Sequence, residues 1–235
     1  MTFVDELKVR FADTWALYLR HDFFTNLAQG SLSRQSFQFW LEQDLPYVDE
    51  YQRARDTLAD KLRGDDVFED LLPEIDATWR TLPGAQETSF EIEMLQLMGV
   101  RPPEVTFLSA RRSREGYINH LRLAALTGNI ADLAAAMLPC ELGFTEMAQR
   151  VNAVRSPELD STYSKWLDYY LTDEQQRNTD VSVVVLERAV ESLTAEEREH
   201  CQQVFLRSVQ HQILVLDAAW HASDPWPGDA PGNRP

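Results

Sequence analysis

The sequence predicts an all-α protein built as a single-domain bundle of several helices. Apolar residues recur at three- and four-residue steps along most of the chain, which is the spacing of one helix face. Only 9 glycines are present, and the alternation that is typical of strands is scarce. With 235 residues, 44% of them hydrophobic, the chain is large enough for one packed core. No repeat or long linker divides it, so one domain is expected over residues 1–222.

Turn-forming residues separate the predicted helices. Gly30 closes one helix, and Ser33 can cap the next. Thr194 is followed by acidic residues and starts the last helix. The segment 181–186 is rich in valine, but its polar flanks favour a buried helix over a strand. The predicted helices cover residues 3–19, 21–29, 34–63, 65–82, 86–98, 104–127, 130–153, 158–171, 173–192 and 195–222. Residues 223–235 are rich in proline and glycine and are expected to form a disordered tail.

The charge and the cysteine content narrow the classes of partner. The formal net charge is −16, whereas nucleic acid and anionic membranes require clustered Lys and Arg, so neither is expected as a partner. Cys140 and Cys201 are the two cysteines, and they imply no disulfide framework. The chain begins with acidic residues, and no apolar run reaches membrane-spanning length. These observations predict a soluble cytoplasmic protein.

Asp44 interrupts the apolar face of the helix that is predicted from residue 34. The other residues of that face are Phe37, Trp40, Leu41, Tyr47, Val48 and Tyr51. A buried carboxylate without partners costs several kcal/mol or shifts its pKa upward. Two interpretations follow. Asp44 pairs with an Arg or a Tyr hydroxyl of a neighbouring helix, or it accepts hydrogen bonds from the amino groups of a ligand.

Cys140 lies on the apolar face of the helix predicted over residues 130–153. Its neighbours on that face are Leu133, Ala136, Met137, Phe144 and Met147. A lone buried cysteine is usually an inert core residue. Pro139 comes immediately before it, and a proline inside a helix removes a backbone hydrogen bond and kinks the chain. Such a kink can aim the thiol into a cavity, so core packing and a nucleophilic role both remain open.

Gln212 is the polar residue on the inward face of the last predicted helix. That face also carries Phe205, Val209, Leu216 and Ala219. Its amide needs partners at both ends, and a hydrogen bond to backbone or to a Tyr is the simplest solution. Tyr117 and Tyr170 also face inward and are either core or pocket wall. Glu141 directly follows Cys140 and is expected to point to a different face.

The sequence contains no pattern for a metal or a nucleotide cofactor. Metal sites in helical bundles use Glu-x-x-His pairs or close clusters of His, Asp and Glu, and no such pattern occurs in the sequence. Asp217 and His221 are four residues apart but lack a third ligand at helical spacing. A P-loop and a glycine-rich dinucleotide motif are also missing. Neither a metal nor a cofactor is therefore expected.

Four segments in order give the chain a resemblance to a known family. They are residues 21–32 continued by Phe37, Trp40, Leu41, Gln43 and Asp44; Tyr117 followed by Pro139, Cys140 and Phe144; residues 166–170; and Phe205 with Ser208, Gln212 and residues 215–220. Over about residues 5–221 the chain resembles TenA, the thiaminase II proteins. That family has the haem-oxygenase-like helical fold and needs neither haem nor metal, so the resemblance implies the same fold here.

The resemblance also implies an activity and the residues that perform it. Members of the family hydrolyse aminopyrimidines related to thiamin, salvage the pyrimidine by deamination and can cleave thiamin itself. By resemblance, Cys140 is the nucleophile that adds to the pyrimidine ring, and Asp44 binds the ring amidine through charge-assisted hydrogen bonds. Tyr47, Tyr117 and Tyr170 form an aromatic slot for the ring. A homo-oligomer, commonly a tetramer, is expected on the same ground.

Two positions depart from the family pattern. Phe144 stands where the family usually has Tyr, and Gln212 stands where it has the Glu that moves protons. General acid–base help is typically worth about two to four orders of magnitude in rate, and an amide cannot supply it. Three functions stay open: an aminopyrimidine hydrolase with altered substrate or rate, a pyrimidine-binding or regulatory protein without turnover, and a different reaction in the same fold.

Overall fold

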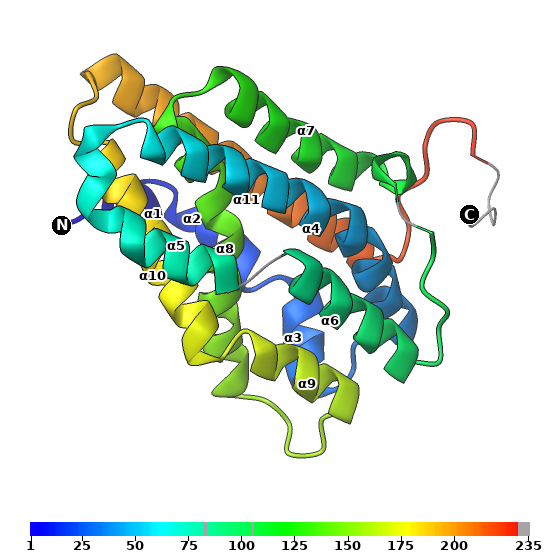
Figure 1. Cartoon of the computed structure of the whole chain (residues 1–235). Helices are drawn as coiled ribbons and strands as arrows, with labels where there is room; N and C mark the ends of the chain where they lie inside the picture. Colours follow the sequence, from blue (N-terminus) through cyan, green and yellow to red (C-terminus); the bar gives the residue numbers. More distant parts are fainter. Residues whose placement is uncertain (82–83, 105, 230–235) are drawn as a thin grey trace.

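A computed structural model describes residues 1–81, 84–104 and 106–229 of the chain, and in this part every regular element is helical (Figure 1). The α-helices are α1 (Phe3–Arg10), α2 (Ala12–Leu19), α3 (Asp22–Gln29), α4 (Arg34–Arg63), α5 (Leu72–Thr81), α6 (Gly84–Leu97), α7 (Arg112–Thr127), α8 (Ile130–Asn152), α9 (Ser161–Tyr169), α10 (Asp173–Ala189) and α11 (Ala195–Trp220). Two short 3₁₀ helices, η1 (Asp66–Leu71) and η2 (Phe107–Ser109), complete the set. The predicted all-α class is confirmed.

Side-chain caps fix where the longest helices begin. Ser33 accepts a hydrogen bond from a backbone N–H in the first turn of α4. Asn129 and Thr194 form capping boxes at the starts of α8 and α11, where the acidic side chain three positions on accepts a hydrogen bond from the backbone N–H of the cap residue. Gly30 ends α3 in the left-handed conformation, with φ at 71°, which costs glycine little. The expected caps at Ser33 and Thr194 and the helical state of residues 181–186 are confirmed.

Several boundaries differ from the sequence prediction. The predicted helix 3–19 is divided at Phe11, where φ is −111° and ψ is 29°, although no glycine or proline marks the site. Asp65 caps the 3₁₀ helix η1, so the α-helical part begins only at Leu72. The helix predicted from residue 104 starts at Arg112. Residue 82, the predicted end of one helix, lies outside the described residues.

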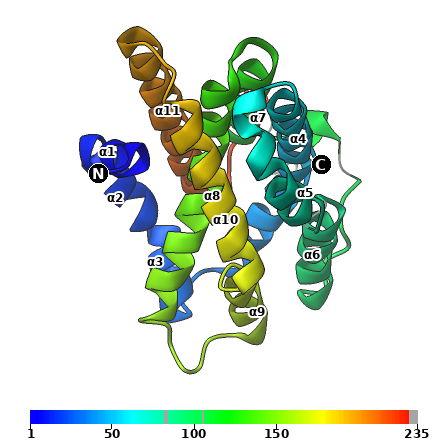
Figure 2. The ribbon, with the colours of Figure 1, turned by 60° about the vertical axis from the view of Figure 1, so that its left-hand side comes forward.

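Helix α8 forms the centre of the bundle (Figure 2). It packs most extensively against α11 and α10, and it also contacts α4 and α7. Helix α4 also packs against α6 and α7. α8 is buried along most of its length, and most positions of its sequence are apolar, as expected for a helix at the centre of a bundle. The helix continues through Pro139, whose nitrogen cannot donate to the preceding turn.

Gly143 lets a buried tyrosine of α2 lie unusually close to α8. A β-carbon at this position of α8 would lie 2.1 Å from Cε1 and 2.7 Å from the hydroxyl oxygen of Tyr18. Tyr18 belongs to α2 and is completely buried. Only a residue without a side chain therefore allows the Tyr18 ring to lie against α8, one turn after Cys140.

The chain after α11 folds back onto the start of α7. Asp224 is buried and accepts hydrogen bonds from the backbone nitrogen of Ser113, at 2.7 Å, and from the Arg112 side chain, at 3.1 Å. Asp229 forms an ion pair with Arg111. Within residues 223–229 a buried carboxylate thus serves as a cap for a distant helix. The disordered tail expected over residues 223–235 stays a prediction, and residues 230–235 lie outside the described part. Within the described residues, no helix combines the length and apolar character that crossing a membrane requires.

Candidate functional site

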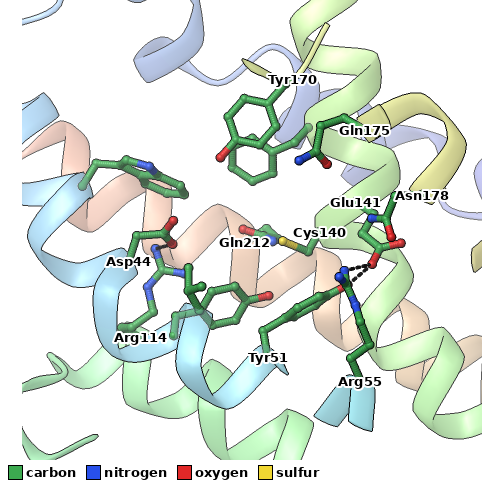
Figure 3. A pocket seen from close by; sticks show the side chains of 14 residues that line it. Asp44, Tyr51, Arg55, Arg114, Cys140, Glu141, Tyr170, Gln175, Asn178 and Gln212 are labelled. Atoms are coloured by element: carbon green, nitrogen blue, oxygen red, sulfur yellow. Dashed lines mark hydrogen bonds and ion pairs between the residues drawn. The ribbon is translucent and has the colours of Figure 1, made fainter. Parts of the chain in front are cut away.

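A cavity lies between α4, α8, α10 and α11, with α7 and the end of α9 completing its wall (Figure 3). The space between its lining atoms, open solvent at the mouth included, amounts to about 520 Å³. Three residues singled out in the sequence, Asp44, Cys140 and Gln212, all line it. Side chains separated by up to 168 positions are thus brought to one place by three different helices.

Aromatic side chains form part of the cavity wall, among polar and charged residues. Phe144 lies 5.5 Å from Trp40 and 5.0 Å from Tyr170 between ring centroids. Tyr47 lines the cavity from α4, as predicted, together with Tyr51, which sequence reasoning did not assign. Flat rings on several sides suit a flat aromatic ligand.

Tyr117 does not line the cavity and instead supports it from behind. It is completely buried, and its ring stacks on Tyr47 at 5.0 Å and on His211 at 5.6 Å. Its hydroxyl accepts a hydrogen bond from Nε2 of Gln212, at 3.3 Å. Burial raises the pKa of Tyr117 far above its usual range, so the phenol stays protonated at neutral pH. Of the three tyrosines expected to form the slot, Tyr47 and Tyr170 line the cavity, and Tyr117 lies behind it.

Asp44 forms a buried ion pair with Arg114 of α7. Nη2 of Arg114 lies 3.0 Å from Oδ1 of Asp44, and the two side chains are 1% and 6% exposed. The guanidinium group also lies over the rings of Trp40 and Tyr47, at 4.9 and 4.7 Å. Burial raises the pKa of Asp44 above its usual value, and Arg114 opposes that rise. The interpretation of Asp44 as the partner of a neighbouring Arg is confirmed, and the pair still faces the cavity.

Cys140 lies at the cavity surface among buried phenols. Its side chain is partly exposed, in contrast to Cys201, which is buried and whose pKa is raised by that burial to about 12. Burial, with the adjacent Cys140 as a further cause, raises the pKa values of Tyr18 and Tyr47 well above their usual range. Cys140 is therefore the thiol that an incoming ligand can reach, and its phenolic neighbours keep their protons at neutral pH and can act as hydrogen-bond donors.

Gln212 fills the third predicted position and is completely buried. Its Nε2 is held by Tyr117, which matches the expected hydrogen bond to a Tyr, whereas its Oε1 has no hydrogen-bond partner among the described residues. An amide accepts and donates hydrogen bonds but does not titrate. At this place in the cavity the protein can orient a ligand but cannot exchange a proton with it.

Glu141, the residue after Cys140, also lines the cavity. Its Oε1 lies 2.6 Å from Nη2 of Arg55 and accepts a hydrogen bond of 2.6 Å from the Tyr51 hydroxyl. Both charged side chains are 7% exposed. Consecutive helical residues differ by about 100° in direction. The cavity reaches around α8 from α11 to α10, so Cys140 and Glu141 both reach it.

Helix α10 contributes two polar residues that sequence reasoning missed, Gln175 and Asn178. Asn178 is 2% exposed, and its Oδ1 has no hydrogen-bond partner among the described residues. A signal for it existed, because Asn178 precedes Val181 and Val185 at three- and four-residue steps and so interrupts an apolar face.

Side chains suited to a metal do not gather in the described part of the structure. Nowhere in that part do three or more His, Cys, Asp or Glu side chains lie close enough to hold a metal ion. The charged residues of the cavity form two carboxylate–guanidinium pairs instead. The chemistry that these residues can perform is nucleophilic attack by a thiol on a flat ligand held by hydrogen bonds.

The fold and the site together define a class: an all-helical protein with an internal aromatic cavity that carries one accessible thiol and two buried ion pairs. The chain belongs to the TENA/THI-4/PQQC family, which it matches over residues 9–222. The resemblance stated from the sequence motifs is thus confirmed at the level of the family.

Relatives of known name cover nearly the whole chain. An aminopyrimidine aminohydrolase of Halalkalibacterium halodurans is 22% identical over 227 residues, which is 94% of this chain and 96% of that protein. An aminopyrimidine aminohydrolase of Helicobacter pylori is 19% identical over 208 residues, 88% of this chain and 94% of that protein. The solved structure of a TenA homologue from P. horikoshii OT3 superposes with a TM-score of 0.80 at 18% identity, covering 95% of this chain and 100% of that one. The haem-oxygenase-like helical fold expected from the resemblance is the fold of this neighbour.

Proposed function

We propose that this protein is an aminopyrimidine aminohydrolase of thiamin metabolism. It would replace the amino group of an aminomethyl-pyrimidine by a hydroxyl group from water and release ammonia. The observation that carries the proposal is the presence of Cys140 and Asp44 in one cavity with the aromatic rings of Tyr47, Phe144 and Tyr170. The names of the relatives from H. halodurans and H. pylori support the same substrate class.

Asp44 and the aromatic residues bind the ring in this proposal. The Asp44 carboxylate accepts hydrogen bonds from the ring amino group, and Arg114 favours the charged form of the carboxylate, which opposes the effect of burial on the Asp44 pKa. Tyr47, Phe144 and Tyr170 contact the faces and edges of the ring. Tyr117 has an indirect role, since it holds the amide of Gln212 in place.

Cys140 performs the covalent step. Its sulfur forms a bond to a ring carbon, the amine leaves as ammonia, water supplies the hydroxyl group, and the carbon–sulfur bond breaks to return the free thiol. Gln212 orients the ligand through Oε1 or Nε2 but carries no proton for the reaction. Water is then left to supply and accept the protons, because burial holds the pKa values of Tyr18, Tyr47 and Tyr117 far above their usual range. We therefore expect a slower reaction than a carboxylate at position 212 would give.

An ammonia-release assay with aminomethyl-aminopyrimidine tests the proposal. Cys140→Ser should abolish ammonia release. Cys201→Ser is the control and should leave release intact, because Cys201 is buried and does not line the cavity. Gln212→Glu should raise the rate by about tenfold or more, because general acid–base help is worth about 10²–10⁴. Unchanged activity of Cys140→Ser would refute the covalent mechanism. Unchanged activity of Gln212→Glu would refute the role given to residue 212.

A second candidate function is favoured by one observation, the non-titrating amide at position 212. In this alternative the protein binds a pyrimidine through Asp44 without turning it over, as a binding or regulatory protein. Calorimetry with hydroxymethyl-aminopyrimidine separates the two functions when it is combined with the ammonia assay. Binding with no ammonia release by the wild type supports the alternative, and undetectable binding dismisses it.

A further inference from the structure

Arg111, the N-cap residue of α7, makes no cap hydrogen bond through its side chain, so this helix begins without a cap of its own. The first N–H groups of a helix lack partners inside it and need acceptors from elsewhere. Gln43 of α4 accepts a hydrogen bond from the backbone nitrogen of Arg111, at 2.7 Å. Asp224 accepts one from the backbone nitrogen of Ser113, also at 2.7 Å. The start of α7 is therefore held from outside, in part by the segment that follows α11 (Figure 1).

Asp224 uses both of its carboxylate oxygens at this helix start. Oδ2 accepts hydrogen bonds from the backbone nitrogen of Ser113 and, at 2.8 Å, from its hydroxyl group. Oδ1 lies 3.0 Å from Nη2 of Arg112. A buried charge is costly unless it is paired and hydrogen-bonded, so these contacts fix the segment after α11 and the start of α7 to each other. The negative charge also lies at a helix N-terminus, where the helix dipole favours it.

Arg114 is the third residue of α7 and lies in the first turn that these contacts hold. Its guanidinium group pairs with Asp44 at 3.0 Å and lies over the rings of Trp40 and Tyr47. Its Nε has no hydrogen-bond partner among the described residues, so the backbone of the first turn largely decides where the group lies. Helix ends fray and lose stability when their caps are removed. Loss of the Asp224 contacts would therefore loosen Arg114 beside Asp44.

We propose that Asp224 is a positioning residue for the pyrimidine site: it holds the first turn of α7 so that Arg114 stays paired with Asp44, and the segment after α11 thereby contributes to ligand affinity. This inference rests on the proposed function, in which Asp44 binds the ring, and adds to it a residue that does not line the cavity. Burial raises the pKa of Asp44, and Arg114 opposes that rise. A displaced Arg114 would favour the protonated carboxyl group, which accepts fewer hydrogen bonds from a ligand.

Calorimetry with hydroxymethyl-aminopyrimidine tests the inference on three variants, without relying on turnover. Asp224→Ala should weaken binding by about fivefold or more, because loss of a cap changes the stability of a helix end by about that factor. Asp224→Asn should weaken it by about two- to threefold, since its amide oxygen still accepts from Ser113 while its NH₂ group cannot accept from Arg112. Asp65→Ala is the matched control, because Asp65 caps η1 through the backbone nitrogen of Val67 at 3.0 Å. It should change the affinity by less than about twofold.

A second measurement separates positioning from a general loss of stability. In the ammonia assay, Asp224→Ala should raise KM by the factor seen in calorimetry and leave kcat nearly unchanged, because binding of the ring is shared by the ground state and the transition state. Wild-type affinity in Asp224→Ala, or equal weakening in Asp65→Ala, would overturn the inference and leave the proposed function standing. If Asp224→Ala fails to fold, unchanged affinity of Asp224→Asn overturns it instead. A wild type that does not bind the ligand would refute the pyrimidine site and this inference together.

Discussion

Gly143→Ala tests the packing that places the thiol-bearing helix. In an exposed helix interior, replacement of Gly by Ala stabilises a protein by about 1 kcal/mol. Here the new methyl group would lie 2.1 Å from Cε1 of Tyr18, whose ring is completely buried and has no room to withdraw. Overpacking of a core costs about 1–3 kcal/mol, and a contact this short belongs at the upper end of that range or beyond it. We expect a net loss of about 2 kcal/mol.

Gly116→Ala in α7 is the matched control. Its added β-carbon would come no closer than 3.4 Å to Cε1 of His211, which is an ordinary contact distance. This variant should be neutral or gain up to about 1 kcal/mol. Urea unfolding measures both variants, and for a chain of this size the loss at Gly143 corresponds to a Tm lower by about 4–8 °C. A Gly143→Ala protein as stable as the wild type would refute the packing between α2 and α8.

Three further predictions concern the charged and polar groups. Asp44→Ala leaves the Arg114 charge buried without its partner and should cost about 3–5 kcal/mol in urea unfolding; a loss below about 1 kcal/mol would contradict the ion pair. Burial lowers the pKa of His120 and of His211 from 6.5 to about 4, so the unfolded chain binds protons first. The contribution of these two histidines to the free energy of unfolding should therefore be complete above pH 6.5 and be lost between pH 6.5 and 4. The loss should be about 1–2 kcal/mol for the pair, a figure reduced because both side chains are partly exposed. A variant lacking both histidines is the control and should not show this loss; equal pH profiles of that variant and the wild type would contradict the pKa shifts. Asp224→Ala removes the remote cap of α7 and should cost about 1 kcal/mol, with faster hydrogen exchange in the first turn of that helix; unchanged exchange there would contradict the cap.

The helices were predictable because their signals are local. Ser33 and Thr194 cap α4 and α11 as expected, and the apolar faces placed Asp44, Cys140 and Gln212 inward. The break at Phe11 was not predictable, because neither glycine nor proline produces it. Burial of Asp224 was not predictable either, because it depends on a contact with the start of α7, more than a hundred residues away in the sequence.

The limits of the site prediction have a geometric origin. Helical periodicity states which face of a helix points inward but not how far the cavity extends around that helix. Glu141 was expected on a different face of α8 from Cys140, and the cavity reaches both residues. The helical pattern left Tyr117 as core or pocket wall, because inward orientation does not distinguish a lining residue from one behind it, and its place in the aromatic slot came from the resemblance. The tetramer and the cytoplasmic location stay predictions.

Protection of Cys140 from alkylation tests the central claim, that an aminopyrimidine occupies the cavity against this thiol. Iodoacetamide with peptide mass analysis reports labelling at each cysteine. Cys140 should react and Cys201 should not, because the first is partly exposed and the second is buried with a pKa raised to about 12. Saturating hydroxymethyl-aminopyrimidine should slow labelling of Cys140 by about tenfold or more. A labelling rate at Cys140 that the bound ligand leaves unchanged would contradict the claim.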